Sequence, residues 1–254
     1  MISNIIIGTP IIHKQDLTDI YKYLHIYSPK RQLGQTLGFS DYAHHFHVKP
    51  GLHFLSTVMD DIHFEDRLSP WNHAHHFPSF FTGMVDTFPV KVSQPEDSAL
   101  SSALFNPKYS ACVYKFQCGV DFLGRIILFT GPHIGVMYDG NIWMATENKH
   151  VLLPWELWLG DGAYVTCPQL LCPYRRPTLG SLSYNQQLMN AVISHYRARV
   201  EHKNKLLERH NILGTRFRGG RELLMDAGEV LAQTENIDSK MHLRYPPIGP
   251  FPHL

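Results

Sequence analysis

The segments FFTGMVDTFPVKVS, residues 80–93, and SACVYKFQCGVDFLGRIILFTG, residues 110–131, dominate the predicted fold. Both are rich in the β-branched and aromatic residues that favour strands. The second segment contains two apolar runs on either side of a turn that spans Gly119 to Gly124. The sequence therefore predicts three antiparallel strands that follow one another along the chain.

Beyond residue 131 the chain alternates helical and strand-like patterns. GPHIGVMYDGNIWMATE, residues 131–147, opens with turn residues and then predicts a short helix. ELWLGDGAY, residues 156–164, predicts a fourth strand, and a proline-punctuated connection follows at residues 167–181. Residues 182–211 form the longest helical pattern of the chain, with apolar residues at helical spacing. Strands and helices in this order predict an α/β fold.

The two ends of the chain differ from this central part. Residues 16–27 and 47–68 carry apolar residues at helical spacing, so residues 1–75 are expected to form a small, mostly helical N-terminal segment. The central domain is expected over residues 76–221. The chain after residue 220 ends in RYPPIGPFPHL, so residues 222–254 are expected to be an extended, partly disordered tail.

The composition indicates a globular protein with separate acidic and basic segments. Its 254 residues are 44% hydrophobic and 12% aromatic, which is enough for a sizeable core and argues against disorder. The formal net charge is +1. Residues 60–100 hold seven acidic and two basic residues, whereas residues 170–221 hold ten Lys or Arg and two Glu, a net charge of +8. A neutral total therefore hides a basic segment.

Cysteine spacing and hydropathy indicate in which cellular compartment the protein is expected. The four cysteines form no Cys-x-x-Cys pair, so free thiols in a reducing compartment are favoured over a metal or disulfide role. The start of the chain, MISNIIIGTPIIHK, lacks the basic region and the long apolar core of a signal peptide. The sequence contains no run of about 18 apolar residues, so no transmembrane helix is predicted. A soluble, intracellular protein is expected.

Three acidic residues stand at informative places in this order of elements. Asp86 lies in the middle of the first predicted strand, between apolar neighbours, where a lone carboxylate is costly to bury. Asp161 ends the fourth strand, where it is either a turn residue or a functional carboxylate. Glu201 lies at the edge of the apolar stripe of the long helix, and its spacing from Arg197 and Lys205 also fits a surface salt-bridge ladder. Carboxylates on neighbouring elements suit metal-assisted phosphoryl transfer, because Mg²⁺ and Mn²⁺ prefer carboxylate oxygens.

A set of short segments surrounds these acids in a characteristic order. They are VDTFPV at 85–90, GVDFLGRI at 119–126, GPHIGVMYDGNIW at 131–143, LGDGAY at 159–164 with LLCPYRRP at 170–177, and RVEH at 199–202. Together they resemble the DDE transposases of the PIF/Harbinger type, including the Harbinger transposase-derived nucleases. The resemblance covers about residues 70–220, and the joint order of the segments is what makes it specific.

The resemblance implies an RNase H-like fold, a mixed sheet flanked by helices, and the activity of a DDE superfamily endonuclease. It assigns Asp86, Asp161 and Glu201 as catalytic residues that bind Mg²⁺ or Mn²⁺, so that water or a 3′-hydroxyl attacks a DNA phosphate. The expected partners are DNA, a separate DNA-binding protein and further copies of the chain, with no membrane, and the expected location is the nucleus. The alternative is a decayed or domesticated copy that binds DNA or protein without cutting. An unrelated metal-dependent hydrolase is a further alternative.

Basic residues on both sides of Glu201 predict contacts with DNA phosphates near the expected metal site. The expected DNA-binding residues are Arg175, Arg176, Arg199, Lys205, Arg209, Arg216 and Arg218. Arg197 and Lys203 belong to the same basic segment. The plainer alternative for the whole set is a solvated face.

Other chemically suggestive residues receive structural interpretations. Asp139 is expected to start a helix or a turn, and Asp121 is expected to be a hairpin residue. The histidines of HHFH, residues 44–47, and HAHH, residues 73–76, lack the His-Glu-x-x-His spacing of a helical metal site. They are therefore expected to be loop or packing residues.

Overall fold

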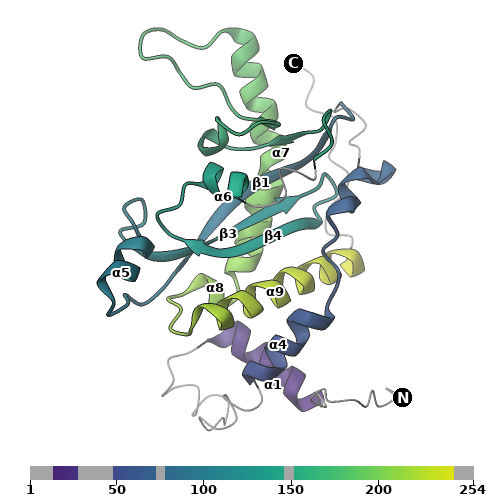
Figure 1. Cartoon of the computed structure of the whole chain (residues 1–254). Helices are drawn as coiled ribbons and strands as arrows, with labels where there is room; N and C mark the ends of the chain where they lie inside the picture. The colour runs from purple at the N-terminus through teal and green to yellow at the C-terminus, as the bar shows by residue number, and fades with distance from the viewer. Residues whose placement is uncertain (1–13, 28–47, 73–77, 146–151, 243–254) are drawn as a thin grey trace.

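A computed structural model describes four ranges of the chain, residues 14–27, 48–72, 78–145 and 152–242. A mixed sheet lies at the centre of this described part (Figure 1). Three of its strands form the predicted antiparallel meander, which is confirmed: β1 (Phe81–Lys91), β3 (Ala111–Val120) and β4 (Ile126–Ile134). Phe88 of β1 pairs with Phe116 of β3, and their rings stack with centroids 5.7 Å apart.

Two short strands extend the sheet beyond the other edge of β1. β5 (Leu157–Leu159) runs parallel to β1, and β6 (Leu170–Leu171) runs parallel to β5. The strand order is β2-β3-β1-β5-β6, where β2 (Phe105–Asn106) and β4 both pair with β3. The predicted fourth strand is confirmed but is shorter than expected, because a 3₁₀ turn, η5 (Gly162–Tyr164), replaces its end.

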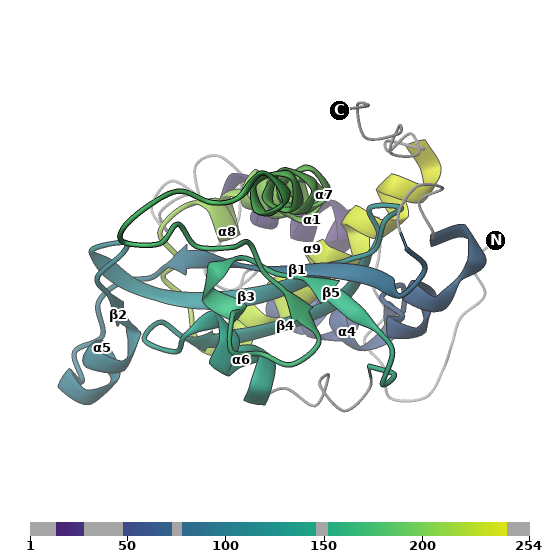
Figure 2. The ribbon, with the colours of Figure 1, turned by 90° about the horizontal axis from the view of Figure 1, so that it is seen from above.

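One face of the sheet is covered by α7 (Tyr184–Glu208), which packs across β1 (Figure 2). The helix begins with a capping box, in which the Ser183 hydroxyl accepts from the Gln186 backbone and the Gln186 side chain accepts from the Ser183 backbone. Its buried residues recur at helical spacing and face the sheet, among them Ile193, Tyr196, Val200 and Leu207. The long helix predicted over residues 182–211 is thus confirmed.

The segment after residue 220 is helical, so the expectation of an extended tail is wrong for its described part. α9 (Arg221–His242) packs on the same face of the sheet as α7, and it buries Leu224, Ala227 and Leu231. Gly228 permits this close approach, because a Cβ there would lie 2.8 Å from the Phe116 ring. The apolar spacing of α9 is present in the sequence. The expectation of an extended tail rested on the proline-rich end of the chain, and residues 243–254 lie outside the described residues.

The opposite face of the sheet carries a second apolar cluster, which includes Trp158 of β5 and Trp143 of α6 (Asp139–Ala145). The Trp158 side chain is fully buried and lies over Gly83 of β1 and Gly119 of β3. A Cβ on either glycine would lie 2.7 Å from the indole ring. Only glycine therefore leaves room for this ring, which joins β5 to the meander.

A buried ion pair supports the same strand. Arg67 of η2 (Phe64–Leu68) donates through Nε and Nη2 to the two carboxylate oxygens of Glu156, at 2.8 and 2.9 Å. The Thr82 hydroxyl donates to Glu156 Oε1 at 2.7 Å and accepts from Trp158 Nε1 at 2.9 Å. Burying two charges is tolerable when the pair is bidentate and further hydrogen-bonded, as here. The network fixes the position at which β5 begins.

The described N-terminal segment is mostly helical, as expected. The helix predicted over residues 16–27 is confirmed as α1 (Lys14–Ile26). The helix predicted over residues 47–68 is shorter, since α4 (Lys49–Val58) ends where Met59 becomes extended. α4 packs mainly against α9, and α1 packs against α8. The sequence analysis did not predict three short elements, α8 (Asn211–Gly214), α5 (Ser98–Leu104) and the 3₁₀ turn η3 (Pro70–Asn72).

These elements form an RNase H-like α/β fold, a mixed sheet flanked by helices, which confirms the expected fold class. Figure 2 shows α7 on one side of the sheet and α6 on the other. The four cysteines are free thiols, as expected. Within the described ranges, no helix combines the length and the apolar character needed to cross a membrane.

Asn236 of α9 makes the side-chain contacts that dock this helix against the sheet, and we expect it to be needed for stability. Its amide accepts from Ile126 N at 2.7 Å, and it donates to Ile126 O at 2.7 Å and to Asp61 O at 3.0 Å, with 1% of the residue exposed. Asn236→Ala leaves buried backbone groups without partners, so the free energy of unfolding should fall by about 2–3 kcal/mol, measured by urea denaturation.

The control for this prediction is Glu222→Ala, which changes an exposed residue in the first turn of the same helix. Exposed substitutions of this kind usually change stability by less than about 0.5 kcal/mol. Equal stability losses in the two variants would contradict the role given to Asn236.

Candidate functional site

Asp86 lies in the middle of β1, on the face that α7 covers. Its neighbours on that face, Met84 and Phe88, are buried in the main apolar core. Asp86 itself is only 18% exposed in its side chain, and its Oδ2 accepts from Asn204 Nδ2 of α7 at 3.3 Å. A carboxylate therefore stands among apolar residues beneath a helix, where burial favours its neutral form.

Asp161 stands beside Asp86 because β1 and β5 are parallel neighbours. Met84 pairs with Leu159 in this register, and each aspartate lies two residues further along its strand direction. Asp161 also caps η5, since its Oδ1 accepts from Ala163 N at 2.8 Å. Asp161 can therefore be both a turn residue and a functional carboxylate, because only one of its two oxygens caps the turn.

Glu201 projects from α7 on the flank that carries Arg197. It follows Val200, which faces the sheet, and one residue corresponds to about 100° around a helix. Its side chain is 49% exposed, and Oε1 lies 3.5 Å from Arg197 Nη1. The helix ion pair expected from the spacing of these two residues is present.

Arg197 joins two of the expected catalytic acids. Its Nη2 lies 3.6 Å from Asp86 Oδ1, while its Nη1 contacts Glu201. The side chain is only 11% exposed, and its buried Nε has no hydrogen-bond partner among the described residues. A single guanidinium therefore lies between Asp86 and Glu201, and the sequence analysis did not single it out for this position.

The pKa of Asp86 depends on its burial and on the charges around it. Burial raises the pKa of Asp86 to about 6, and the Arg197 charge opposes this shift. The carboxylates of Asp161 and Glu201 each raise the Asp86 pKa further. Like charges that share a site shift a pKa in this direction.

The donor chemistry of the three acids fits a divalent ion, although their side chains are not gathered around one point. Within the described ranges, no group of three or more His, Cys, Asp and Glu residues is close enough to hold an ion. The arrangement nevertheless presents hard carboxylate oxygens, the ligands that Mg²⁺ and Mn²⁺ prefer. The Arg197 guanidinium already stands as a cation between two of these carboxylates.

The expected DNA-binding residues fall into different places. Arg175 is exposed and donates to Gly162 O at 2.7 Å, next to Asp161. Lys205 and Arg209 are exposed at the C-terminal end of α7, and Arg176 is exposed and donates to Gly180 O at 3.4 Å. Their contact with DNA stays a prediction.

Three further members of the basic segment lie away from the acids. Arg199 is partly buried and precedes Glu201 by two residues, about 200° around the helix, so it occupies the other flank of α7. Arg216 and Arg218 flank Phe217, which bridges to Val92 at the far end of β1.

Lys203 corrects the interpretation of this segment as one solvated or DNA-contacting face. It is fully buried, and its Nζ donates to Ser239 Oγ at 2.5 Å and approaches Glu235 O at 3.5 Å. The position of Lys203 one turn beyond Val200 places it toward α9. This lysine therefore helps to dock the two helices.

The remaining acids are structural, as expected. Asp139 starts α6 and pairs with the buried Lys115 at 2.9 Å. Asp121 is fully buried in the β3–β4 hairpin, where it accepts from Leu123 N, Arg125 N and Arg125 Nε. The two histidine motifs, residues 44–47 and 73–76, lie outside the described residues.

A mixed sheet flanked by helices is the fold of RNase H-like nucleases, and Asp86 of β1, Asp161 just after β5 and Glu201 of α7 are acidic residues of this fold. Comparison with protein families gives the same class, since the family described as DDE superfamily endonuclease matches residues 85–233, more than half of the chain. The chain belongs to this family. Such endonucleases generally use divalent metal ions and act on DNA. Neither the curated proteins nor the solved structures contain a match to the chain.

The raised pKa of Asp86 predicts a pH-dependent loss of stability in metal-free buffer. An aspartate in an unfolded chain titrates near pH 4, whereas folding raises the Asp86 pKa to about 6. Between these values the folded state binds more protons, so the free energy of unfolding falls as the pH rises. Asp86→Asn removes this contribution and should gain stability over the wild type by on the order of 2 kcal/mol between about pH 4 and 7. Urea denaturation in a chelator measures the difference, and a difference that does not change with pH would contradict the prediction.

Proposed function

We propose that the chain is a nuclease of the PIF/Harbinger transposase type, and that Asp86, Asp161 and Glu201 are its metal-binding catalytic residues. The observation that supports the proposal best is the register of the parallel strands β1 and β5, in which Met84 pairs with Leu159 and each aspartate follows two residues later. Glu201 faces this edge from α7, since it shares the Arg197 guanidinium with Asp86. The same three residues carry the family motifs in the sequence.

When bound, Mg²⁺ or Mn²⁺ would polarise a DNA phosphate and lower the pKa of the attacking water or 3′-hydroxyl. Asp86 would hold the ion from a rigid strand, because its strand is paired on both edges. Asp161 has one oxygen free of the η5 cap. Glu201 is half exposed on a helix, so its side chain can turn toward the aspartates or toward the DNA.

DNA would reach the acids along the exposed edge formed by η5 and the C-terminal half of α7. Arg175 is exposed beside η5, and Lys205 and Arg209 are exposed at the C-terminal end of α7. Phosphate contacts of such side chains hold the duplex without reading its sequence. We therefore propose that this chain alone binds DNA without sequence preference, that a separate protein and further copies of the chain complete the complex, and that it acts in the nucleus.

Substitution of the acids is expected to abolish cleavage without abolishing DNA binding. Asp161→Asn and Glu201→Gln keep the shape of the side chains but remove the charge that would hold the ion, so cutting of a plasmid in Mn²⁺ should fall by at least about 100-fold. Binding of a labelled duplex, measured by fluorescence anisotropy in a chelator, should stay within about threefold of wild type, because the basic side chains are unchanged.

The matched control is Glu208→Gln, which makes the same change seven residues later on the same helix. It should cut DNA at the wild-type rate. A wild-type protein that binds the duplex but cuts neither plasmid nor oligonucleotide would instead identify the decayed or domesticated alternative.

We further propose that Arg197 stands in the place of a cation in the metal-free protein and competes with the ion. Arg197→Met removes a positive charge from between two carboxylates, so the melting temperature in a chelator should fall. Mn²⁺ should then raise the melting temperature by more than it does in the wild type, because ion binding no longer has to displace the guanidinium. Differential scanning fluorimetry across a Mn²⁺ series measures both changes.

Arg199→Met is the control for Arg197, because it removes a guanidinium from the other flank of the same helix. The Mn²⁺-dependent rise in this variant should equal that of wild type. A smaller rise in Arg197→Met than in wild type would mean that the arginine assists ion binding rather than competing with it.

A further inference from the structure

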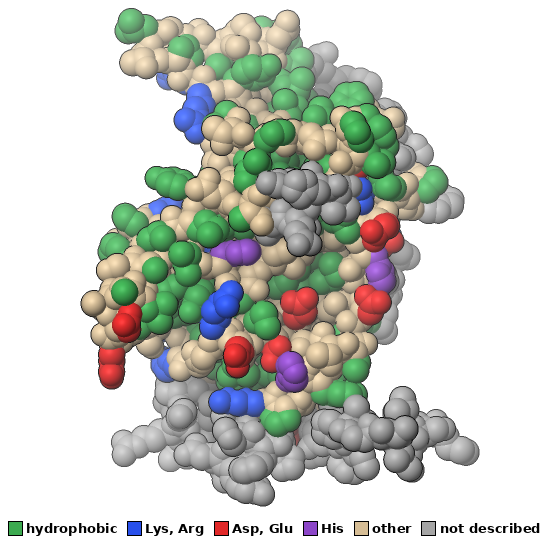
Figure 3. All heavy atoms as spheres, viewed as in Figure 1, with side chains coloured by type: hydrophobic (Ala, Val, Ile, Leu, Met, Phe, Trp, Pro, Cys, Tyr) green, Lys and Arg blue, Asp and Glu red, His purple; other side chains and the backbone are tan. Residues whose placement is uncertain are grey.

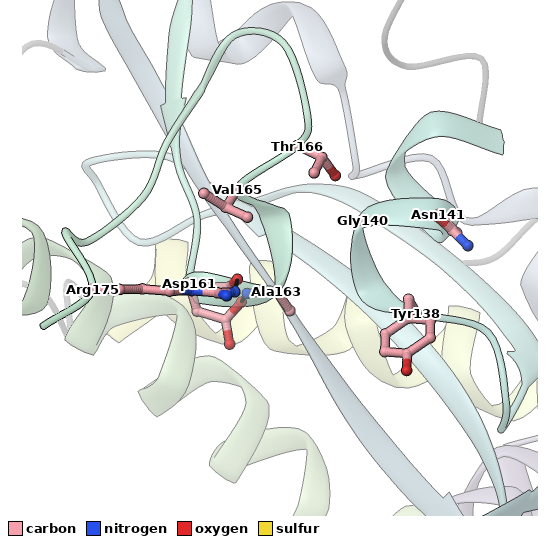
Figure 4. Close-up of a pocket in the computed structure, with 9 residues that line it drawn as sticks. Tyr138, Gly140, Asn141, Asp161, Ala163, Val165, Thr166 and Arg175 are labelled. Atoms are coloured by element: carbon pink, nitrogen blue, oxygen red, sulfur yellow. Dashed lines mark hydrogen bonds between the residues drawn. The ribbon is translucent and has the colours of Figure 1, made fainter. Parts of the chain in front are cut away.

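An open pocket of about 510 Å³ lies on the side of Asp161 that faces α6 (Figure 4). Its walls come from α6 with the turn before it, from η5, and from the connection that follows β6. The residues that matter for its chemistry are Tyr138, Asn141, Asp161, Val165, Thr166 and Arg175. A volume of this size lies in the range of small-ligand pockets.

The walls of this pocket are held in place by the packing of α6 against η5. Gly140 lies so close to η5 that a Cβ there would be 2.9 Å from Ala163 O. Cys167 Sγ also donates to Gly140 O at 3.4 Å. These contacts fix the two walls relative to each other, so the pocket is formed by packed elements of the fold.

The pocket combines exposed apolar surface with hydrogen-bonding groups. Tyr138 is 75% exposed and Val165 is 54% exposed, and both line it. Figure 3 shows hydrophobic side chains exposed on the face of the molecule that carries α5 and α6. Asn141 and Thr166 add polar side chains, and Figure 4 shows the Tyr138 ring on the far side of the pocket from Arg175. An exposed ring beside polar groups suits a flat, polar aromatic ligand.

The charge on the opposite wall points to a phosphate on the same ligand. Arg175 lines the pocket, and its Nη2 is held by Gly162 O at 2.7 Å. A guanidinium fixed in this way still has donors for an anionic oxygen. Asp161 lines the pocket too, so a ligand here lies next to the phosphate that would be cleaved at the proposed catalytic site.

We propose that this pocket binds one unpaired nucleotide of the DNA strand, adjacent to the phosphate to be cut. The base would stack on Tyr138 and contact Asn141 or Thr166, while its phosphate would meet Arg175. The openness of the pocket suits a nucleotide that stays joined to the strand on both sides. This inference rests on the proposed nuclease function and adds a site for an extruded or single-stranded base.

The test uses duplexes that carry 2-aminopurine at one position at a time, since this base becomes fluorescent when it leaves the stack. With the wild-type protein in a chelator, one position should give a change in fluorescence that its neighbours do not give, because this base leaves the duplex stack for the Tyr138 ring. Tyr138→Ala should change the fluorescence at this position relative to wild type and weaken binding to a duplex with a single-stranded end by roughly fivefold or more, because base stacking on an aromatic ring is lost.

The matched control is Tyr174→Ala, which removes another exposed tyrosine, one that does not line the pocket. It should keep both the signal and the affinity. A fluorescence signal that is absent at every position, or is the same in Tyr138→Ala as in wild type, would overturn the nucleotide pocket. Plasmid cutting by the wild-type protein is measured separately, so a failure of the pocket is distinguished from a failure of the nuclease function.

Discussion

The packing of Trp158 over two glycines is the constraint on which the rest of the site depends. β5 pairs with β1 over only a few residues, which is little backbone hydrogen bonding to fix a register. The indole ring adds packing contacts that help to fix the register of this short strand. Gly83 and Gly119 leave room for the ring, and a side chain at either position would not. The hydrogen bond from Trp158 to Thr82, and from there to the Glu156–Arg67 pair, holds the ring at one height.

That register has an electrostatic consequence on the other side of the sheet. Once Leu159 pairs with Met84, Asp86 and Asp161 come side by side, and the fold must hold like charges together. In the metal-free protein the cost is reduced in two ways, by the raised pKa of Asp86 and by the Arg197 guanidinium. Both responses are reversible, as the cation-binding role proposed for this site requires.

The helices that cover the sheet determine the positions of the side chains around Asp86. α7 carries Glu201, Arg197 and Asn204 on one flank, so their position relative to Asp86 depends on how α7 sits on β1. α9 holds α7 through Lys203 and holds the sheet through Asn236. A segment that lies outside the expected domain thereby belongs to the machinery that keeps the acids in place.

The meander and the long helix were predictable from the sequence, because strand and helix periodicities depend on residues that are close in the chain. Short family motifs also pointed to Asp86, Asp161 and Glu201, whose catalytic role stays a proposal. The sequence did not determine that Lys203 is buried, that α9 completes the core, or that Arg197 lies between two carboxylates. Those features arise from contacts between residues far apart in the chain, such as Arg197 with Asp86 and Lys203 with Ser239. A basic side chain has the same spacing on a helix whether it faces water, a carboxylate or another helix, and only the tertiary packing decides among the three.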